Sequence, residues 1–139
     1  MARRAKALVG FAVAACAAAL PAQAESVRCQ LTYGGETRQI EAGPTATPYT
    51  VAPVAIGSFF LFRIVFRQTP AELSSVKLYT YANRDSGPVL IHQASYAYPA
   101  ATSPSPAAVN GFTGLNLVYE PLRDSELQYW CDVKSGAEK

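Results

Sequence analysis

The stretch FFLFRIVFR, residues 59–67, is the most apolar segment that follows the first two dozen residues of the chain. Its side chains alternate with a period of two, which predicts a β-strand. One face collects Phe60, Phe62, Ile64 and Phe66, and the other carries Phe59, Leu61, Arg63, Val65 and Arg67. We therefore predict a central strand over residues 58–68, buried on the first face and partly covered on the second. The two arginines could bind an anion, but a solvated strand face is the simpler interpretation.

The same alternation continues outward from this strand in both directions. Gly34-Gly35 separates two alternating segments and predicts a two-residue hairpin turn. Further strands are predicted over residues 26–33, 36–42, 76–83, 88–98, 112–120 and 126–133, with a short edge strand around residues 49–51. Residues 68–75 contain Pro70 and predict a loop that can hold a single helical turn. No long segment shows the helical period.

About seven to eight short strands, with a turn roughly every ten residues, predict an all-β fold. The expected architecture is a small antiparallel β-sandwich with immunoglobulin-like layers, or an antiparallel barrel. In true immunoglobulin domains a tryptophan lies between the two cysteines, whereas Trp130 directly precedes Cys131. The likeness is therefore one of architecture only.

Residues 1–24 have the three parts of a bacterial secretory signal peptide. Arg3, Arg4 and Lys6 make a positively charged start, and an uncharged apolar run follows over residues 7–20. Ala22-Gln23-Ala24 then supplies the small-x-small cleavage pattern. The apolar run is shorter than the roughly 20 residues that cross a membrane, so no transmembrane span is expected.

Cleavage would leave a single β domain over residues 25–133 and a flexible tail over residues 134–139, in the periplasm or secreted. This chain would carry nine Lys and Arg against ten Asp and Glu, because three of the cations lie in the signal peptide. Such a balance does not favour a basic nucleic-acid-binding surface, and no nucleic acid is expected as a partner.

Cys16 leaves one alternative open. Val13-Ala14-Ala15-Cys16 has the look of a lipoprotein cleavage box, and a lipid on Cys16 would tether the mature protein to a membrane. Cleavage there would leave Ala17-Ala18-Ala19-Leu20 as an unusually apolar tether. We therefore favour Cys16 as a small apolar residue of the signal peptide, without a lipid anchor.

The remaining cysteines, Cys29 and Cys131, are predicted to form a disulfide, since an exported chain meets an oxidising compartment. The bridge would tie the first strand to the last. A metal site and a redox pair are the alternatives. Neither is favoured, because no CxxC spacing occurs and the one histidine, His92, is distant in sequence.

The residue types of catalytic and metal sites are sparse. There is no GxSxG motif and no paired-carboxylate motif, and His92 lies on a predicted strand. After residue 24 the chain contains no methionine, one histidine and two cysteines, which disfavours a soft-metal site. We expect no enzyme, no cofactor and no metal, and keep a hydrolase that uses His92 as a remote alternative.

Tyrosines supply a candidate binding patch. Tyr79 and Tyr81 share a face of one predicted strand, and Tyr96 and Tyr98 share a face of its hairpin partner. Together the four rings could form a flat surface that binds a protein or a glycan. The alternative is that they only stabilise the sheet through cross-strand pairs, and we give it more weight.

Val27-Arg28-Cys29-Gln30 resembles the opening strand and cysteine of the small periplasmic inhibitors of C-type lysozyme. The resemblance covers only these residues. The downstream serine–glycine inhibitory loop of that family has no counterpart in the sequence, so no function is inferred from it.

Three functional hypotheses follow. The first is an exported, non-enzymatic binding or accessory module of the bacterial envelope, with an envelope protein or glycan as partner. The second is a small inhibitor or structural protein that acts through the proline-containing loop over residues 99–110. The third is the hydrolase that uses His92.

Overall fold

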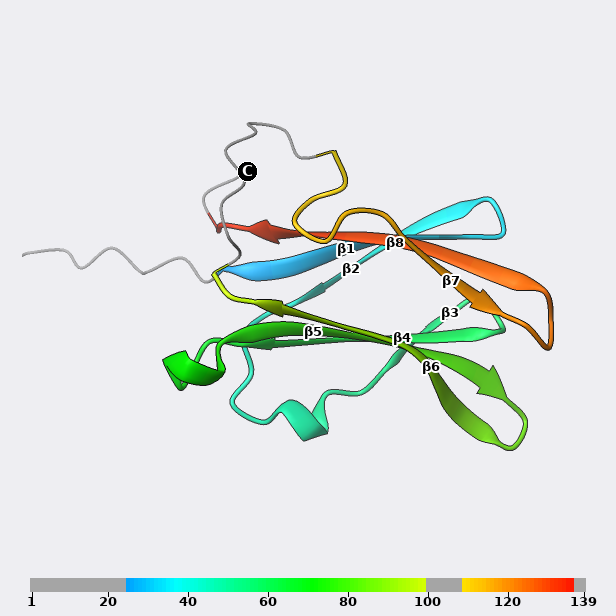
Figure 1. Ribbon diagram of the computed structural model, residues 1–139, viewed down its shortest axis with the longest axis horizontal. Coiled ribbons are helices and arrows are strands. Elements are labelled where there is room, and N and C mark those ends of the chain that lie inside the picture. The colour runs from blue at the N-terminus through cyan, green and yellow to red at the C-terminus, as the bar shows by residue number, and fades with distance from the viewer. Residues whose placement is uncertain (1–24, 100–108, 137–139) are drawn as a thin grey trace, which may run out of the picture.

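The computed structural model describes residues 25–99 and 109–136, and these form two antiparallel four-stranded sheets packed face to face (Figure 1). One sheet has the strand order β2-β1-β8-β7 and the other β3-β4-β5-β6. The strands are β1 (Ser26–Tyr33), β2 (Glu36–Ala42), β3 (Val54–Ile56), β4 (Phe60–Arg67), β5 (Ser75–Arg84), β6 (Gly87–Ala97), β7 (Asn116–Glu120) and β8 (Ser125–Lys134). The predicted all-β sandwich is confirmed, and it is not a barrel.

The core lies between the two sheets and is built from the alternating faces of their strands. As predicted, Phe60, Phe62, Ile64 and Phe66 of β4 are buried. They meet the inward side chains of the opposite sheet, where the ring of Tyr129 packs 4.9 Å from that of Phe62. Burial of such large apolar side chains is worth roughly 1.5–3 kcal/mol each and is the main source of stability.

The predicted disulfide between Cys29 and Cys131 is also confirmed. These residues face each other on β1 and β8, so the bridge joins neighbouring strands of one sheet rather than two sheets. The backbone N–H of Cys131 donates to Thr113 Oγ1 (2.9 Å), and its carbonyl accepts from the N–H of Phe112 (3.0 Å). Both groups therefore point away from β1. Cys29 and Cys131 thus face each other as a non-hydrogen-bonded pair, the kind in which the two side chains lie closest.

The edge strand predicted around residues 49–51 lies elsewhere in the structure. Residues Pro48–Thr50 form a 3₁₀ turn, η1, instead of an edge strand, and the short edge strand is β3. Proline at the start of η1 removes a donor, and the hydroxyl of Thr50 caps the turn by donating to the carbonyl of Thr47 (2.8 Å). The second 3₁₀ turn, η2 (Ala71–Leu73), lies in the loop where a helical turn was expected.

The strand predicted over residues 112–120 begins only at Asn116. The preceding residues run along the end of β8 instead, and Gly111 forms a bridge with Cys131 there. A Cβ on Gly111 would lie 2.0 Å from the carbonyl oxygen of Cys131, and its φ is +61°. Glycine has no Cβ to meet this carbonyl, and it adopts this left-handed backbone conformation without steric cost.

The predicted signal peptide and most of the loop over residues 99–110 lie outside the described residues. Strand β8 continues to Lys134, one position past the predicted domain end. Within residues 25–99 and 109–136 there is no helix with the length and apolar character needed to cross a membrane.

Candidate functional site

The four tyrosines of the predicted patch divide between the two faces of their sheet. Tyr79 and Tyr81 lie on the outer face with their rings stacked, 6.5 Å apart and inclined by 21°. Tyr96 is paired with Val76, a core residue, and therefore faces inward, where it packs on Phe112. Directly opposed residues of a sheet share a face, which corrects the expectation of one surface made of four tyrosines.

Tyr98 follows Tyr96 inward and packs its ring 4.7 Å from that of Phe66. The two tyrosine pairs therefore have different surroundings. Tyr96 and Tyr98 extend the core, and only Tyr79 and Tyr81 remain on the outer surface.

His92 lies between the sheets, and its Nε2 is 2.8 Å from the hydroxyl of Tyr129 on β8. Burial lowers the pKa of His92 below its ordinary 6.5, and burial raises the pKa of Tyr129. No serine, thiol or carboxylate among the described residues forms a hydrogen bond to this histidine. The arrangement is that of an inter-sheet contact and lends no support to the hydrolase hypothesis.

The side chains that could bind a metal ion are dispersed over the described part of the chain. No group of three or more His, Cys, Asp or Glu side chains in the described part of the chain could hold a metal ion. The two cysteines are consumed by the disulfide.

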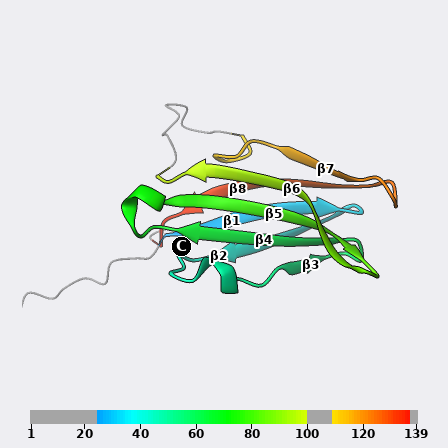
Figure 2. The ribbon, with the colours of Figure 1, turned by 60° about the horizontal axis from the view of Figure 1, so that its bottom comes forward.

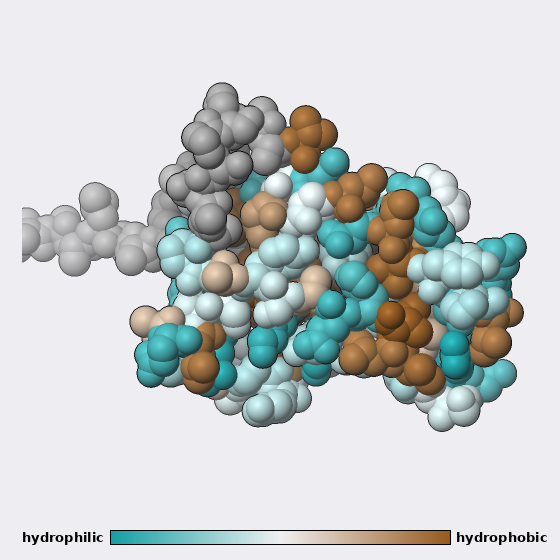
Figure 3. Space-filling model, viewed as in Figure 1, coloured by the Kyte–Doolittle hydropathy of each residue, from teal (hydrophilic) through white to brown (hydrophobic). Residues whose placement is uncertain are grey.

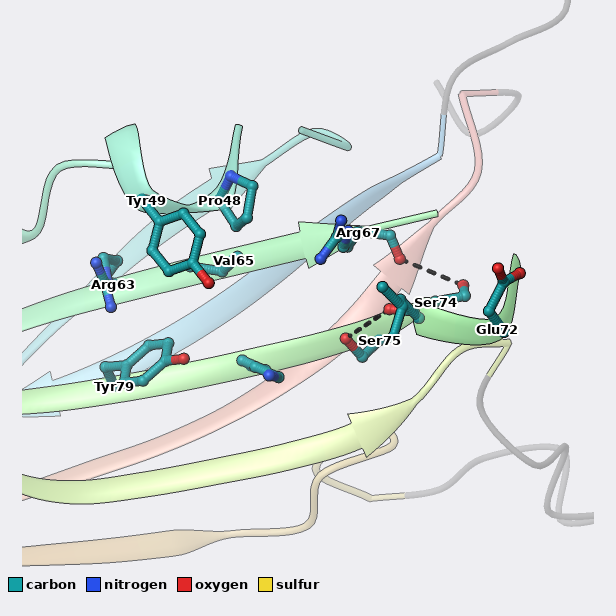
Figure 4. A pocket seen from close by; sticks show the side chains of 11 residues that line it. Pro48, Tyr49, Arg63, Val65, Arg67, Glu72, Ser74, Ser75 and Tyr79 are labelled. Atoms are coloured by element: carbon teal, nitrogen blue, oxygen red, sulfur yellow. Dashed lines mark hydrogen bonds between the residues drawn. The ribbon is translucent and has the colours of Figure 1, made fainter. Parts of the chain in front are cut away.

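A groove on the outer face of β4 and β5 is the best-formed candidate site (Figure 4). Its volume is about 290 Å³, near the lower end of pockets that bind small molecules. We call it the β4–β5 groove. Its lining residues come from η1, β4, η2, β5 and the junction between η2 and β5: Pro48, Tyr49, Arg63, Val65, Arg67, Glu72, Leu73, Ser74, Ser75, Lys77 and Tyr79.

The floor and one wall of the groove are apolar. Val65 points outward from β4 and yet is only 5 % exposed. Figure 4 shows Pro48 and Tyr49 of η1 lying over β4 beside Val65, with Tyr79 on the neighbouring strand β5. Tyr49 itself is 96 % exposed. An open aromatic ring at the edge of a groove offers a ligand a large contact area with a polar tip.

Three cations share this face because of the strand register. Lys77 is paired with Val65, and the two neighbours of Val65 on the same face of β4 are Arg63 and Arg67. Diagonal neighbours across a sheet lie about 7–8 Å apart, within reach of long side chains. Among the described residues Glu72 is the one acidic side chain that lines the groove, so this lining carries a net positive charge.

The guanidinium of Arg63 is held in a defined position. Its central carbon lies 4.3 Å from the centroid of the Tyr79 ring and 5.9 Å from that of Tyr81, both distances typical of a cation–π contact. Its Nε is buried and has no hydrogen-bond partner in the described part of the protein. The terminal N–H groups of this guanidinium make no hydrogen bond in the described residues, so they can donate to an anion.

None of the three cations is neutralised by an ion pair within residues 25–99 and 109–136. The ion pairs found there join Arg28 to Glu41 and Arg84 to Glu120. Arg67 donates from Nε to the carbonyl of Thr69 (3.2 Å), which leaves its other N–H groups for a ligand.

Serine hydroxyls close one end of the groove. Ser74 Oγ donates to the carbonyl of Arg67, and Ser75 Oγ donates to the carbonyl of Leu73, both at 3.2 Å (Figure 4). A hydroxyl that donates to a carbonyl still has lone pairs that accept. The groove therefore offers cationic donors and hydroxyl acceptors side by side.

A second polar cluster lies at the opposite end of β5. Glu120 is fully buried and accepts from Arg84 Nη2 (3.0 Å) and from the backbone N–H groups of Leu122 and Arg123. Burial alone would raise the pKa of Glu120, but these donors hold it below its usual range. The cluster joins the β5–β6 turn to the β7–β8 turn, and its partners are all internal.

Apolar side chains gather over the edge strands β6 and β7 (Figure 3). The two strands belong to different sheets and lie close together along one side of the sandwich (Figure 2). The exposed members of this surface are Val89, Leu90, Leu115, Leu117, Tyr119 and Leu122. It contains no polar groups arranged around a cavity.

Sequence reasoning found part of the groove. It placed Arg63 and Arg67 on one outward face and named an anion as a possible ligand, and it placed Tyr79 and Tyr81 on one strand face. It missed Lys77 and Tyr49. The register of β4 with β5 would have brought Lys77 opposite Val65, but no local signal predicts that η1 folds over β4.

Comparisons with protein-family models, with curated proteins and with solved structures found no match to this chain.

Proposed function

We propose that this protein is a non-enzymatic binding module of the bacterial envelope, and that it binds its partner in the β4–β5 groove. The observation that carries the proposal is the combination of three cations without ion pairs and an exposed tyrosine around one cavity of about 290 Å³. Charges of one sign around a cavity raise the local concentration of a partner of the opposite charge.

The rigid frame supports this proposal. The groove lies on β4 and β5, whose other faces supply the core residues Phe62, Phe66 and Leu78. The disulfide stabilises the opposite sheet. Side chains anchored on such strands keep their positions when a ligand arrives, which lowers the entropic cost of binding.

Export to the envelope is part of the same proposal. The basic start, apolar run and cleavage pattern of residues 1–24 support it, and so does the disulfide, because such bridges persist in oxidising compartments. The partner is then a component of the envelope or of the space outside it.

Capture from envelope fractions tests the proposal. The protein, purified after export from its full-length chain, is immobilised and incubated with soluble and wall fractions of the bacterial envelope. A variant that combines Tyr49→Ala with Lys77→Glu changes two exposed groove residues and leaves the core untouched. Arg28→Gln, on the outer face of the other sheet, is the matched control for loss of a cation.

We expect the wild type and Arg28→Gln to retain the same component, and the double variant to lose it. Retention of the component by all three proteins would show that the binding site lies outside the groove. Absence of any retained component with the wild type would contradict the proposed function.

A further inference from the structure

We infer that the ligand of the β4–β5 groove is an anionic saccharide, whose carboxylate or phosphate group is held by Arg63, Arg67 and Lys77. The inference rests on the proposed binding function and names the chemical class of its ligand. It is carried by the charge of the groove, by the stacked Arg63 guanidinium and by the hydroxyl groups of the lining.

The charge selects an anion. Arg63 and Arg67 each stand two positions from Val65 on one face of β4, and Lys77 stands across from Val65. All three side chains line the same groove, so its charge attracts an anionic group. Guanidinium groups bind carboxylates and phosphates through paired hydrogen bonds, and these charge-assisted bonds are roughly twice as strong as neutral ones.

Arg63 is prepared for this role before a ligand arrives. Stacking on Tyr79 fixes the plane of the guanidinium, so less conformational freedom is lost on binding. Its Nε is buried, and its terminal N–H groups make no hydrogen bond within residues 25–99 and 109–136, so those terminal groups can donate to an incoming oxygen.

The rest of the lining favours a sugar over an acidic peptide. Four side-chain hydroxyls, those of Tyr49, Ser74, Ser75 and Tyr79, line a cavity of about 290 Å³. Hydroxyl groups can exchange donor and acceptor roles, which suits the hydroxyls of a sugar ring. The exposed ring of Tyr49 can pack against the apolar face of that ring. An extended peptide would instead pair with a strand edge, and β4 and β5 are both central strands.

Titration calorimetry with defined probes tests this inference, using the protein purified after export from its full-length chain. Trigalacturonate supplies carboxylates and mannose 6-phosphate supplies a phosphate. Maltotriose is the neutral saccharide, and a hexaglutamate peptide is the acidic non-saccharide. We expect one or both anionic saccharides to bind, with weaker binding at about 200 mM than at about 20 mM salt, and no measurable binding of maltotriose. The stronger of the two anionic probes identifies the charged group.

Variants locate the binding. Arg63→Gln and Arg67→Gln are each expected to raise the dissociation constant roughly tenfold, which is the effect of losing one charge-assisted contact. Lys77→Gln should weaken binding several-fold, and because Lys77 is exposed this variant stays informative if an arginine variant fails to fold. Arg28→Gln should leave the dissociation constant unchanged.

Three calorimetric results would overturn the inference: equal binding of maltotriose and trigalacturonate, tighter binding of hexaglutamate than of either anionic saccharide, or an equal loss with Arg28→Gln and Arg63→Gln. Groove-dependent capture of envelope material with no binding of either anionic saccharide would also overturn it. In that last case the proposed function would stand and only the ligand class would fail.

Discussion

The imidazole of His92 on β6 and the phenol of Tyr129 on β8 meet between the two sheets, with Nε2 of His92 2.8 Å from the Tyr129 hydroxyl. The contact joins the sheet that carries the groove to the sheet that carries the disulfide. It places the one histidine of the chain at a structural junction, where its protonation state affects stability.

Stability should therefore fall on mild acidification. Burial lowers the pKa of folded His92 below 6.5, so the unfolded chain binds a proton more readily than the folded chain. The contribution of His92 to the free energy of unfolding is constant well above that pH. It decreases as the pH falls through 6.5 toward the lower folded pKa.

Urea denaturation at about pH 8 and about pH 5 measures the effect, with His92→Gln as the reference that lacks the titrating group. We expect the loss of stability between the two pH values to be larger for the wild type than for His92→Gln. An equal loss in both proteins would show that folding does not shift the pKa of His92.

The disulfide should contribute strongly to stability. Its cysteines are 102 residues apart in sequence, and the bridge restricts nearly the whole unfolded domain. Replacing both with alanine is expected to lower the free energy of unfolding by about 2–5 kcal/mol. Chemical reduction of the wild type should give a loss of similar size, and an unchanged urea midpoint in both cases would contradict this prediction.

Glu120 should be far less tolerant of neutralisation than an exposed glutamate of the same region. Glu120→Gln leaves the guanidinium of Arg84 without its carboxylate and weakens the two backbone contacts at residues 122 and 123. Glu126 is exposed on β8, and Glu126→Gln is the matched control. We expect a clear decrease in Tm for Glu120→Gln and almost none for Glu126→Gln; equal Tm values would refute the role of the cluster.

Gly111→Ala separates a steric clash from backbone strain. The new Cβ would lie 2.0 Å from the carbonyl oxygen of Cys131, whereas a Cβ on Gly114, with a similar φ of +68°, meets nothing within 4 Å. Alanine at Gly114 should cost about 1 kcal/mol through its left-handed conformation alone. Gly111→Ala should cost at least about 2 kcal/mol more, and equal urea midpoints would show that the loop moves away from β8 without cost.

The sandwich was largely predictable because its strands alternate cleanly. Phe59–Arg67 identified a central strand and its buried face, and the Cys29–Cys131 pairing followed from export and the cysteine count. The sequence did not predict the edge strand at residues 54–56 or the late start of β7. Those boundaries depend on long-range contacts, such as the approach of Gly111 to Cys131, that leave no periodic signal in the sequence.

The site was predictable only in part, for a related reason. Alternation groups residues within a strand, but register decides how two strands share a face. Alternation alone therefore predicts the same exposure for Tyr96 and Tyr98 as for Tyr79 and Tyr81. The pairing of Tyr96 with Val76 places Tyr96 and Tyr98 on the inner face instead. Tyr49 belongs to a turn without periodicity, and its place beside Val65 follows from tertiary folding alone.

Binding of an anionic saccharide in the β4–β5 groove is the central claim, and an NMR titration tests it most directly. Increasing trigalacturonate or mannose 6-phosphate is added to ¹⁵N-labelled protein, up to about 10 mM, and amide shifts are followed residue by residue. We predict saturable shifts that cluster at Tyr49, at residues 63–67 and at residues 74–79, with no cluster on β7 or β8. Shifts centred on β7 and β8, or no saturable shifts with either probe, would contradict the claim.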